Sequence, residues 1–275
     1  MATLTPLLEV ERLSALHYKS QGTNTYLIGR GKQRILIDTG EGKPTWASRL
    51  KAVLSEERAT IHQALLTHWH PDHVNGVSDL LQICPDAQIF KNKPTNGQTE
   101  IQDGQVFRAE GATLTAFHTP GHAVDHMVFI LEEENSMFTG DNVLGHGTAV
   151  FEDLKVYIRS LQRMRDRVSG RGYPGHGAVI EDATCRITEY IEHRQQREDE
   201  LLRVLRYGKV DVSVGATPER KGWTPMDLVK LIYKNVPEVL HPRASHGVLQ
   251  VLMKLEDEGQ IVHEDGQWSI EKSAL

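Results

Sequence analysis

The chain has 275 residues, 39% of them hydrophobic and 25% charged, and a formal net charge of −6 when histidine is neutral. This length fits one large domain, or one domain with an appendage. The acidic balance argues against a protein that binds nucleic acid through bulk charge. Two cysteines, Cys84 and Cys185, do not suggest a disulfide framework, so we expect reduced thiols.

The N-terminal residues contain Glu9 and Glu11 and have no basic segment ahead of an apolar run. This pattern is unlike a secretory signal or an arginine-rich transit peptide. No apolar run approaches the length that a membrane-spanning helix needs. We therefore expect a cytoplasmic protein with no membrane partner.

In the first half of the chain, short strand-like runs alternate with helical patterns. The runs ILID and ALLT are apolar throughout, as in strands that are buried on both faces. Apolar residues at helical spacing predict helices over about 46–57 and 76–83. Strands are predicted over 24–29, 34–40, 64–68, 87–91, 112–122 and 126–134. This alternation indicates a layered α/β fold.

Two amphipathic helices are predicted after residue 150. The first covers 152–166, with Glu152 and Asp153 in its first turn, where carboxylates suit the helix dipole. The second covers about 183–206. A break rich in Gly, Pro and small polar residues follows over 207–222.

Beyond this break the pattern changes to that of a small appendage. Helices are predicted over 225–233 and about 242–258, followed by a hairpin that turns at Asp265 and Gly266. Helices followed by a hairpin are typical of a winged-helix-like α+β unit. We therefore predict a main domain over 1–208 and a C-terminal winged-helix-like domain over 217–275.

The segment HWHPDH places four possible metal ligands within six residues: His68, His70, Asp72 and His73. It follows a strand that is predicted to be buried, at the end where α/β sheets place their sites. Burying imidazoles costs desolvation free energy, and a bound metal is the usual interaction that offsets this cost. His68 and His70 can project the same way, and Asp72 and His73 approach from the next helix. Two pairs with different directions suit two metal ions better than one.

One loop cannot complete two coordination shells, and three later segments offer further ligands. They are TPGH with His122, TGD with Asp141, and YPGHG with His176. In each of them a glycine adjoins the polar residue and allows close approach of the backbone. A lone buried histidine is more often a hydrogen-bonded core residue than a ligand. The four segments in this order favour a metal centre.

HxHxDH followed by TPGH, GD and PGHG resembles the metallo-β-lactamase superfamily over about 21–193. The resemblance implies an α/β fold, the αβ/βα four-layer sandwich, with two zinc ions per chain. It assigns the first ion to His68, His70 and His122, and the second to Asp72, His73 and His176. Asp141 would bridge the two ions, and Asp38 in LIDTG would support the metal loop by hydrogen bonds. Imidazole ligands favour zinc, whereas the carboxylates also suit Mn²⁺ or Fe²⁺.

This arrangement predicts a metal-dependent hydrolase in which Asp72 orients an activated water and shuttles its proton. Several segments resemble a narrower branch, which contains lactamase-β-like endoribonucleases and fungal lactamase-like thioesterases. FKNKP, HMVFILEEE and HRQQRE are more similar to the thioesterases. The predicted substrate is an acyl thioester on the acyl carrier protein of a nonreducing polyketide synthase. The alternative is phosphodiester hydrolysis of single-stranded RNA.

Two further features leave alternatives open. A run of arginines on the helix over 152–166 and just beyond it is either a solvated face, the favoured interpretation, or a surface for a carrier protein or RNA; it comprises Arg159, Arg163, Arg165, Arg167 and Arg171. His146 is either an ordinary loop residue or a contact at the rim of the site.

A non-catalytic module that kept the fold is disfavoured, because none of the seven ligands is missing. Relatives usually carry a longer segment where SALHYKS stands, before QGTNTYL.

Overall fold

The computed structural model describes residues 11–14, 22–208, 222–234 and 236–270. It divides the chain into two compact units. The first unit contains Met1–Glu152 and Val156–Tyr190, and the second contains Asp153–Lys155 and Ile191–Leu275. The domain boundary predicted between 208 and 217 falls mainly in 209–221, outside the described residues, and stays a prediction. No described helix has the length and apolar character needed to cross a membrane.

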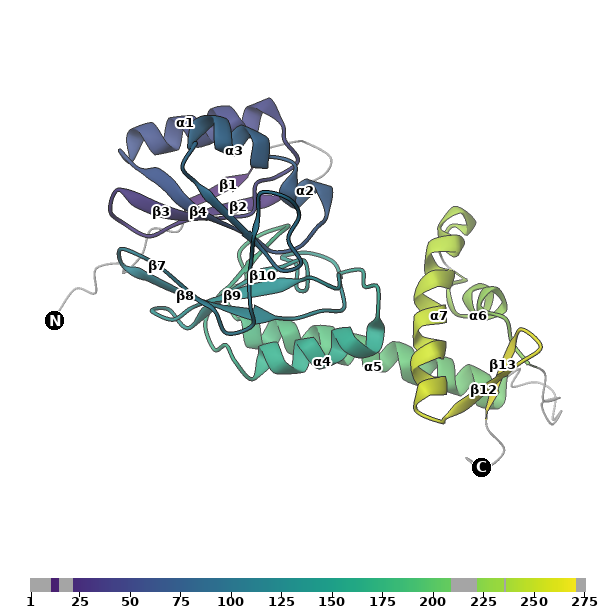
Figure 1. The fold of residues 1–275 in the computed structure, drawn as a ribbon. Coiled ribbons are helices and arrows are strands. Elements are labelled where there is room, and N and C mark those ends of the chain that lie inside the picture. The colour runs from purple at the N-terminus through teal and green to yellow at the C-terminus, as the bar shows by residue number, and fades with distance from the viewer. Residues whose placement is uncertain (1–10, 15–21, 209–221, 235, 271–275) are drawn as a thin grey trace. The chain divides into compact units, whose positions relative to one another are not determined.

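The first unit contains two sheets that face each other (Figure 1). In the first sheet, each strand pairs with the next one in the chain, in the order β1 (Glu11–Ser14), β2 (Asn24–Ile28), β3 (Gln33–Ile37), β4 (Thr60–Leu66), β5 (Gln88–Lys91) and β6 (Thr99–Glu100). The strands β3, β4, β5 and β6 run parallel to one another. The expectation of strands buried on both faces is confirmed for both runs, since every residue of ILID and of ALLT is buried.

The second sheet follows the reverse chain order. Its strands are β11 (Gly172–Pro174), β10 (Ser136–Gly140), β9 (Met127–Leu131), β8 (Ala112–His118) and β7 (Val106–Ala109). Its pairs are antiparallel except β10 with β11, which are parallel. The sheet therefore brings the ends of β10 and β11 together at one edge.

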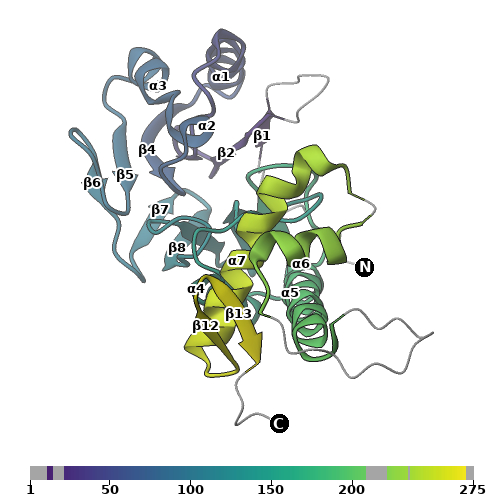
Figure 2. The same ribbon diagram turned by 90° about the vertical axis from the view of Figure 1, so that its right-hand side faces the viewer.

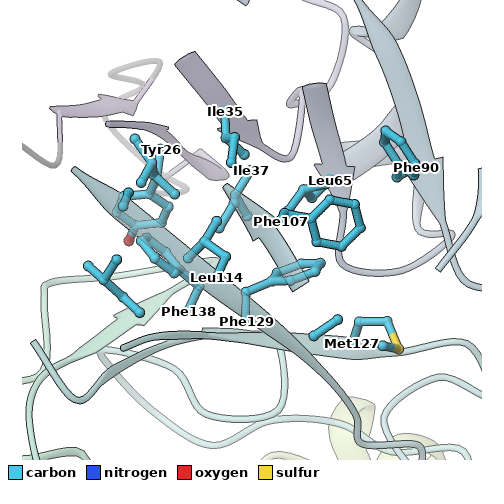
Figure 3. Packing of buried hydrophobic residues seen from close by; sticks show 14 of the residues in the cluster. Tyr26, Ile35, Ile37, Leu65, Phe90, Phe107, Leu114, Met127, Phe129 and Phe138 are labelled. Carbon is cyan, nitrogen blue, oxygen red and sulfur yellow. The ribbon is translucent and has the colours of Figure 1, made fainter. Parts of the chain in front are cut away.

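Side chains from both sheets form the core between them. Tyr26 and Ile37 of the first sheet and Phe129 and Phe138 of the second belong to one buried cluster (Figure 3). The Tyr26 and Phe138 rings meet edge to face at 5.2 Å. This packing of two apolar sheet faces holds the first unit together.

Helices cover the outer faces of the two sheets (Figure 1). On the first sheet, Trp46, Leu50 and Val53 of α1 (Pro44–Glu56) pack in a second buried cluster with Leu80 of α3 (Val77–Ile83). On the second sheet lie α4 (Leu154–Arg165) and the start of α5 (Ala183–Tyr207). The predicted four-layer αβ/βα sandwich is confirmed.

One helix start differs from the prediction. Glu152 and Asp153 precede α4 and do not form its first turn. The backbone N–H of Glu152 donates to the carbonyl of Gly121 at 2.7 Å, which holds this residue in the loop. The apolar face of α4 is as expected, since Leu154, Tyr157 and Leu161 are buried.

The second unit contains the predicted winged-helix-like elements. These are α6 (Pro225–Ile232), α7 (His241–Asp257) and the hairpin β12 (Ile261–Glu264) with β13 (Gln267–Ile270). A short 3₁₀ turn (Glu238–Leu240), which was not predicted, precedes α7. α6 begins with a capping box in which the Thr224 hydroxyl and the Asp227 carboxylate each bond the other's backbone N–H. The helix α6 packs against α7 (Figure 2). Asp265 and Gly266 both have positive φ, 51° and 76°, which fits the predicted tight turn.

Candidate metal centre

The loop after β4 brings four of the predicted site residues together. β4 ends at Leu66, and His68 and His70 follow on either side of a bend at Trp69. Pro71 begins the short helix α2 (Pro71–Val74), and its fixed φ suits this position. Asp72 and His73 therefore approach from the first turn of α2, as predicted.

The other three residues come from the second sheet. Asp141 directly follows β10, His176 lies just beyond β11, and His122 lies in the loop after β8. All seven predicted ligands gather in two groups, each with its ligand atoms within 4.8 Å of one another: His68, His70, His122 and Asp141 in one, and Asp72, His73 and His176 in the other.

In the first group, three ring nitrogens converge on one point. His68 Nε2 lies 2.9 Å from His70 Nδ1, and His122 Nε2 lies 3.2 Å and 3.1 Å from these two atoms. Tetrahedral Zn–N bonds of about 2.0–2.1 Å place ligand nitrogens about 3.3 Å apart. The separations observed are close to this value, so the three imidazoles fit a shared metal ion.

At the second group, two neighbouring buried polar atoms have no hydrogen-bond partner among the described residues: Nε2 of His73, which belongs to this group, and Oδ1 of Asp141, which belongs to the first. They lie 3.4 Å apart, and His73 Nε2 is 3.5 Å from Asp72 Oδ2. His176 Nε2 lies 3.2 Å from Asp72 Oδ2 and 3.3 Å from Asp141 Oδ2. A buried nitrogen that makes no well-aligned hydrogen bond and lies beside two carboxylates fits a site for a second cation.

Asp38 holds the metal loop by hydrogen bonds, as the resemblance implies. Its Oδ1 accepts the backbone N–H of Thr67 at 2.8 Å, and its Oδ2 accepts the Thr67 hydroxyl at 2.9 Å. The Thr67 hydroxyl lies 2.9 Å from His68 Nδ1. Because this hydroxyl gives its proton to Asp38, it accepts from Nδ1 of His68. The Nε2 lone pair of His68 therefore faces the cluster.

Three other ligands are oriented in a similar way. His122 Nδ1 donates to the carbonyl of Val150 at 2.8 Å, which directs its Nε2 into the cluster. The backbone N–H of Asp141 donates to Nε2 of the buried His126 at 3.1 Å. Thr23 donates to Asp72 Oδ2 at 2.9 Å. Sequence reasoning missed Thr23, Thr67 and His126, whose partners lie far along the chain or on the backbone.

The turn that carries His176 is clamped to the first sheet. The Asn24 amide donates to the carbonyls of Pro174 and Gly177 at 2.9 and 3.0 Å, and the Tyr26 hydroxyl donates to Pro174 at 2.8 Å. Gly175 must lack a side chain, since a Cβ there would lie 2.3 Å from Asp141 Oδ1. This contact confirms the expected close approach of the backbone to the site.

The pKa shifts of the site histidines indicate that the clustered carboxylates favour positive charge next to them. Burial lowers the pKa of His68 well below its ordinary value, so its imidazole is neutral and Nε2 can serve as a metal ligand. Burial alone would lower the pKa of His73, but the carboxylates of Asp38 and Asp141 outweigh it and raise that pKa. Protons on His73 and His176 therefore balance the carboxylates when no cation is bound. A divalent cation can supply the same charge.

The arginine run is largely neutralised by carboxylates. Ion pairs join Arg163 to Asp103, Arg165 to Asp166, Arg167 to Glu132 and Arg171 to Glu181. This pairing favours the solvated-face interpretation. His146 is exposed, and its Nδ1 lies close to Gly177 in the His176 turn.

Comparison with known families identifies the chain. Residues 21–89 and 86–176 match the metallo-beta-lactamase superfamily, and residues 224–268 match the beta-lactamase associated winged helix domain. The chain belongs to the metallo-β-lactamase superfamily and is a hydrolase. The family match and the helices and hairpin of the second unit confirm the predicted winged helix.

Similar proteins come from fungi. The lactamase-like protein aptB of Emericella nidulans is 46% identical over 248 residues, which are 90% of this chain and 79% of that protein. The atrochrysone carboxyl ACP thioesterase of Aspergillus chevalieri is 46% identical over 250 residues, which are 90% of this chain and 80% of that protein.

Solved structures show the same fold. A metallo-beta-lactamase family protein from Thermus thermophilus matches with a TM-score of 0.74 and 22% identity, over 97% of this chain and 99% of that one. TTHA1623 in a di-iron-bound form matches with a TM-score of 0.50 and 25% identity, over 66% of this chain and 96% of that one.

Proposed function

We propose that this chain is a thioesterase that hydrolyses an acyl thioester on the acyl carrier protein of a nonreducing polyketide synthase. The observation that carries this proposal is the 46% identity, over 90% of the chain, to a protein named as an atrochrysone carboxyl ACP thioesterase. The gathered histidines and aspartates support hydrolysis as the reaction.

The seven clustered side chains would hold two zinc ions. His68, His70 and His122 would bind the first, and Asp72, His73 and His176 the second, with Asp141 between them. His73 Nε2 and Asp141 Oδ1, two buried atoms that lack a hydrogen bond among the described residues, support this assignment. A bound zinc pair supplies Lewis acidity, which lowers the pKa of water and polarises the thioester carbonyl. Iron or manganese also suits this mixture of imidazole and carboxylate ligands.

Asp72 is the proposed proton carrier. Burial alone would raise its pKa, but hydrogen bonds from His176 and Thr23 and the charge of His73 outweigh this effect and lower it. Asp72 is therefore an ionised carboxylate that can take a proton from the attacking water. As the new C–O bond forms and the C–S bond breaks, Asp72 returns this proton to the departing sulfur. The products are a carboxylic acid and the free thiol of the carrier.

RNA is the weaker substrate hypothesis. Four of the five arginines in the run pair with carboxylates. Across 221–275, the six Lys and Arg residues are outnumbered by eight Asp and Glu residues, which gives this segment a net charge of −2. A groove that binds phosphates needs an excess of cations. No feature of the described residues favours RNA.

The test compares two substrates with one enzyme preparation. Purified protein is given an acyl thioester of an acyl carrier protein, and thiol release is measured; in parallel it is given a single-stranded RNA. We expect thiol release that EDTA abolishes and zinc restores, and an intact RNA. His263→Ala, which removes an exposed histidine of the hairpin, is the control and should retain full activity. RNA cleavage without thiol release would overturn the proposal.

A further inference from the structure

We propose that Trp69, Val124 and Val150 form the surface that holds the acyl group, and that they select an aromatic acyl group. We call these three residues the apolar rim. The inference rests on the proposed thioesterase function and deepens it, because it names the part of the substrate that the site selects. It concerns binding and adds no chemical step.

The first observation is where exposed apolar side chains occur. Among the described residues of the first unit, five large hydrophobic side chains are exposed: Trp69, Leu81, Val106, Val124 and Val150. Three of these five border the proposed metal centre. Trp69 and Val124 lie within two residues of a proposed ligand, and the Val150 carbonyl accepts a hydrogen bond from His122. Their exposed fractions are 48%, 51% and 72% for Trp69, Val124 and Val150. Single exposed apolar residues are ordinary, whereas several gathered at a reaction centre indicate a binding surface.

The second observation is that two of the three rim residues, Trp69 and Val150, contact histidines of the metal centre. Trp69 lies between His68 and His70, and its ring meets the His70 ring at 4.6 Å and 74°. The Val150 carbonyl accepts from His122 Nδ1 at 2.8 Å. His118 Nε2 lies 3.2 Å from the Val124 carbonyl. The backbones of the two valines are therefore engaged by histidines while their side chains remain in solvent.

The loop that carries Val150 is also anchored. Phe151 stacks on the buried Tyr157 at 5.5 Å and 22°, and Glu152 N–H donates to the Gly121 carbonyl at 2.7 Å. A fixed loop gives a preformed surface, which costs little entropy when the substrate binds.

The position of the rim identifies the part of the substrate it contacts. All three residues adjoin the group formed by His68, His70 and His122. The hydroxyl of Thr23 borders the other group, through Asp72. An apolar acyl group gains from burial against the rim, and an indole face also favours stacking with an aromatic ring. The pantetheine arm of the carrier protein, which is rich in amides, gains little free energy from contact with the apolar rim.

The experiment compares two thioesters that share the thiol pantetheine and differ only in the acyl group, naphthoyl or acetyl. For Val150→Ser we expect the KM for the naphthoyl thioester to rise at least fivefold, and for Trp69→Ala at least tenfold. The kcat/KM for the acetyl thioester should change by less than twofold. Trp69→Phe should restore most of the naphthoyl KM. Val106→Ser is the matched control, since Val106 is 42% exposed on the edge strand β7.

The same change for both acyl groups, or none for either, would overturn the apolar rim as an acyl site. The bound metal is measured in every variant. If Trp69→Ala loses metal, Val150→Ser decides the outcome, because it leaves the carbonyl that orients His122 in place. If wild-type protein hydrolyses neither these thioesters nor the thioester of an acyl carrier protein, the proposed function fails. The rim is then tested by titration with a thioether of pantetheine that carries a naphthyl group and cannot be hydrolysed. Tighter binding of this thioether to wild type than to Val150→Ser supports the apolar rim, and equal binding overturns it.

Discussion

Asp38 Oδ2 lies 2.7 Å from Nδ1 of His73, and both side chains are buried. Asp38 reaches this position with a left-handed backbone, at φ 58°. Few residues other than glycine, asparagine and aspartate adopt that conformation readily. One carboxylate thus fixes the ring of a proposed ligand and, through Thr67, the loop that carries the others.

Asp38→Asn should weaken metal binding by about 10–100-fold while the fold is retained. Asparagine tolerates the left-handed backbone and keeps an acceptor for Thr67, but the negative charge beside His73 is lost. Zinc affinity is measured by competition with a chromogenic chelator. Asp86→Asn, at an exposed position, is the control and should bind zinc normally. Equal affinities of the two variants would show that Asp38 does not support the site.

Metal uptake should release protons at pH 7.5. Burial alone would lower the pKa of His176, but hydrogen bonds to Asp141 and Asp72 raise it to about 9 in the metal-free protein. His176 is therefore protonated at pH 7.5 and must lose its proton to bind a metal ion. Calorimetric titration with zinc in two buffers of different ionisation enthalpy gives the number of protons released. His176→Gln should release fewer, and no release from wild type would contradict this assignment.

The same pKa sets the pH dependence of stability without metal. The folded-state pKa of about 9 lies above the ordinary value of 6.5. This stabilisation of the metal-free fold is therefore complete below pH 6.5 and is lost as pH rises through 9. The urea midpoint of chelator-treated wild type should fall over this range by more than that of His176→Gln. Parallel curves for the two proteins would contradict the prediction.

Gly175→Ala should abolish most metal binding. The added Cβ would lie 2.3 Å from Asp141 Oδ1 and 2.9 Å from His73 Cε1, so Asp141 or the turn must move. Gly247→Ala in α7 is the matched control, since a Cβ there meets nothing within 4 Å. The control should bind metal normally and stabilise α7 by up to about 1 kcal/mol. Normal metal content in Gly175→Ala would contradict the close packing of this turn.

Lys91→Met should destabilise the fold by about 3–5 kcal/mol. Lys91 and Asp125 form a buried ion pair, with exposed side-chain fractions of 5% and 2%, and Asp125 Oδ1 has no hydrogen-bond partner among the described residues. Removing the ammonium leaves a buried carboxylate without its counter-ion. Urea unfolding measures the loss. The double variant with Asp125→Leu should recover part of it, and a loss below about 1 kcal/mol in the single variant would refute the prediction.

Much of the fold and the ligand set could be predicted because their signals are local. Apolar runs indicated β3 and β4, and HWHPDH placed four site residues next to one another in the chain. β11 had no such signal: GYP contains Gly172 and Pro174, and it forms a strand because it pairs with β10 at the sheet edge. The contacts of Thr23 and Asn24 depend on tertiary approach across 49 and 150 residues. No local pattern encodes such contacts.

The most direct test of the metal centre is anomalous scattering at the zinc absorption edge from crystals of zinc-loaded protein. We expect two peaks about 3.5–4 Å apart. One should lie among His68, His70 and His122, and the other among Asp72, His73 and His176, with Asp141 between them. A single peak, or zinc bound away from these side chains, would contradict the paired metal centre on which the proposed hydrolysis depends.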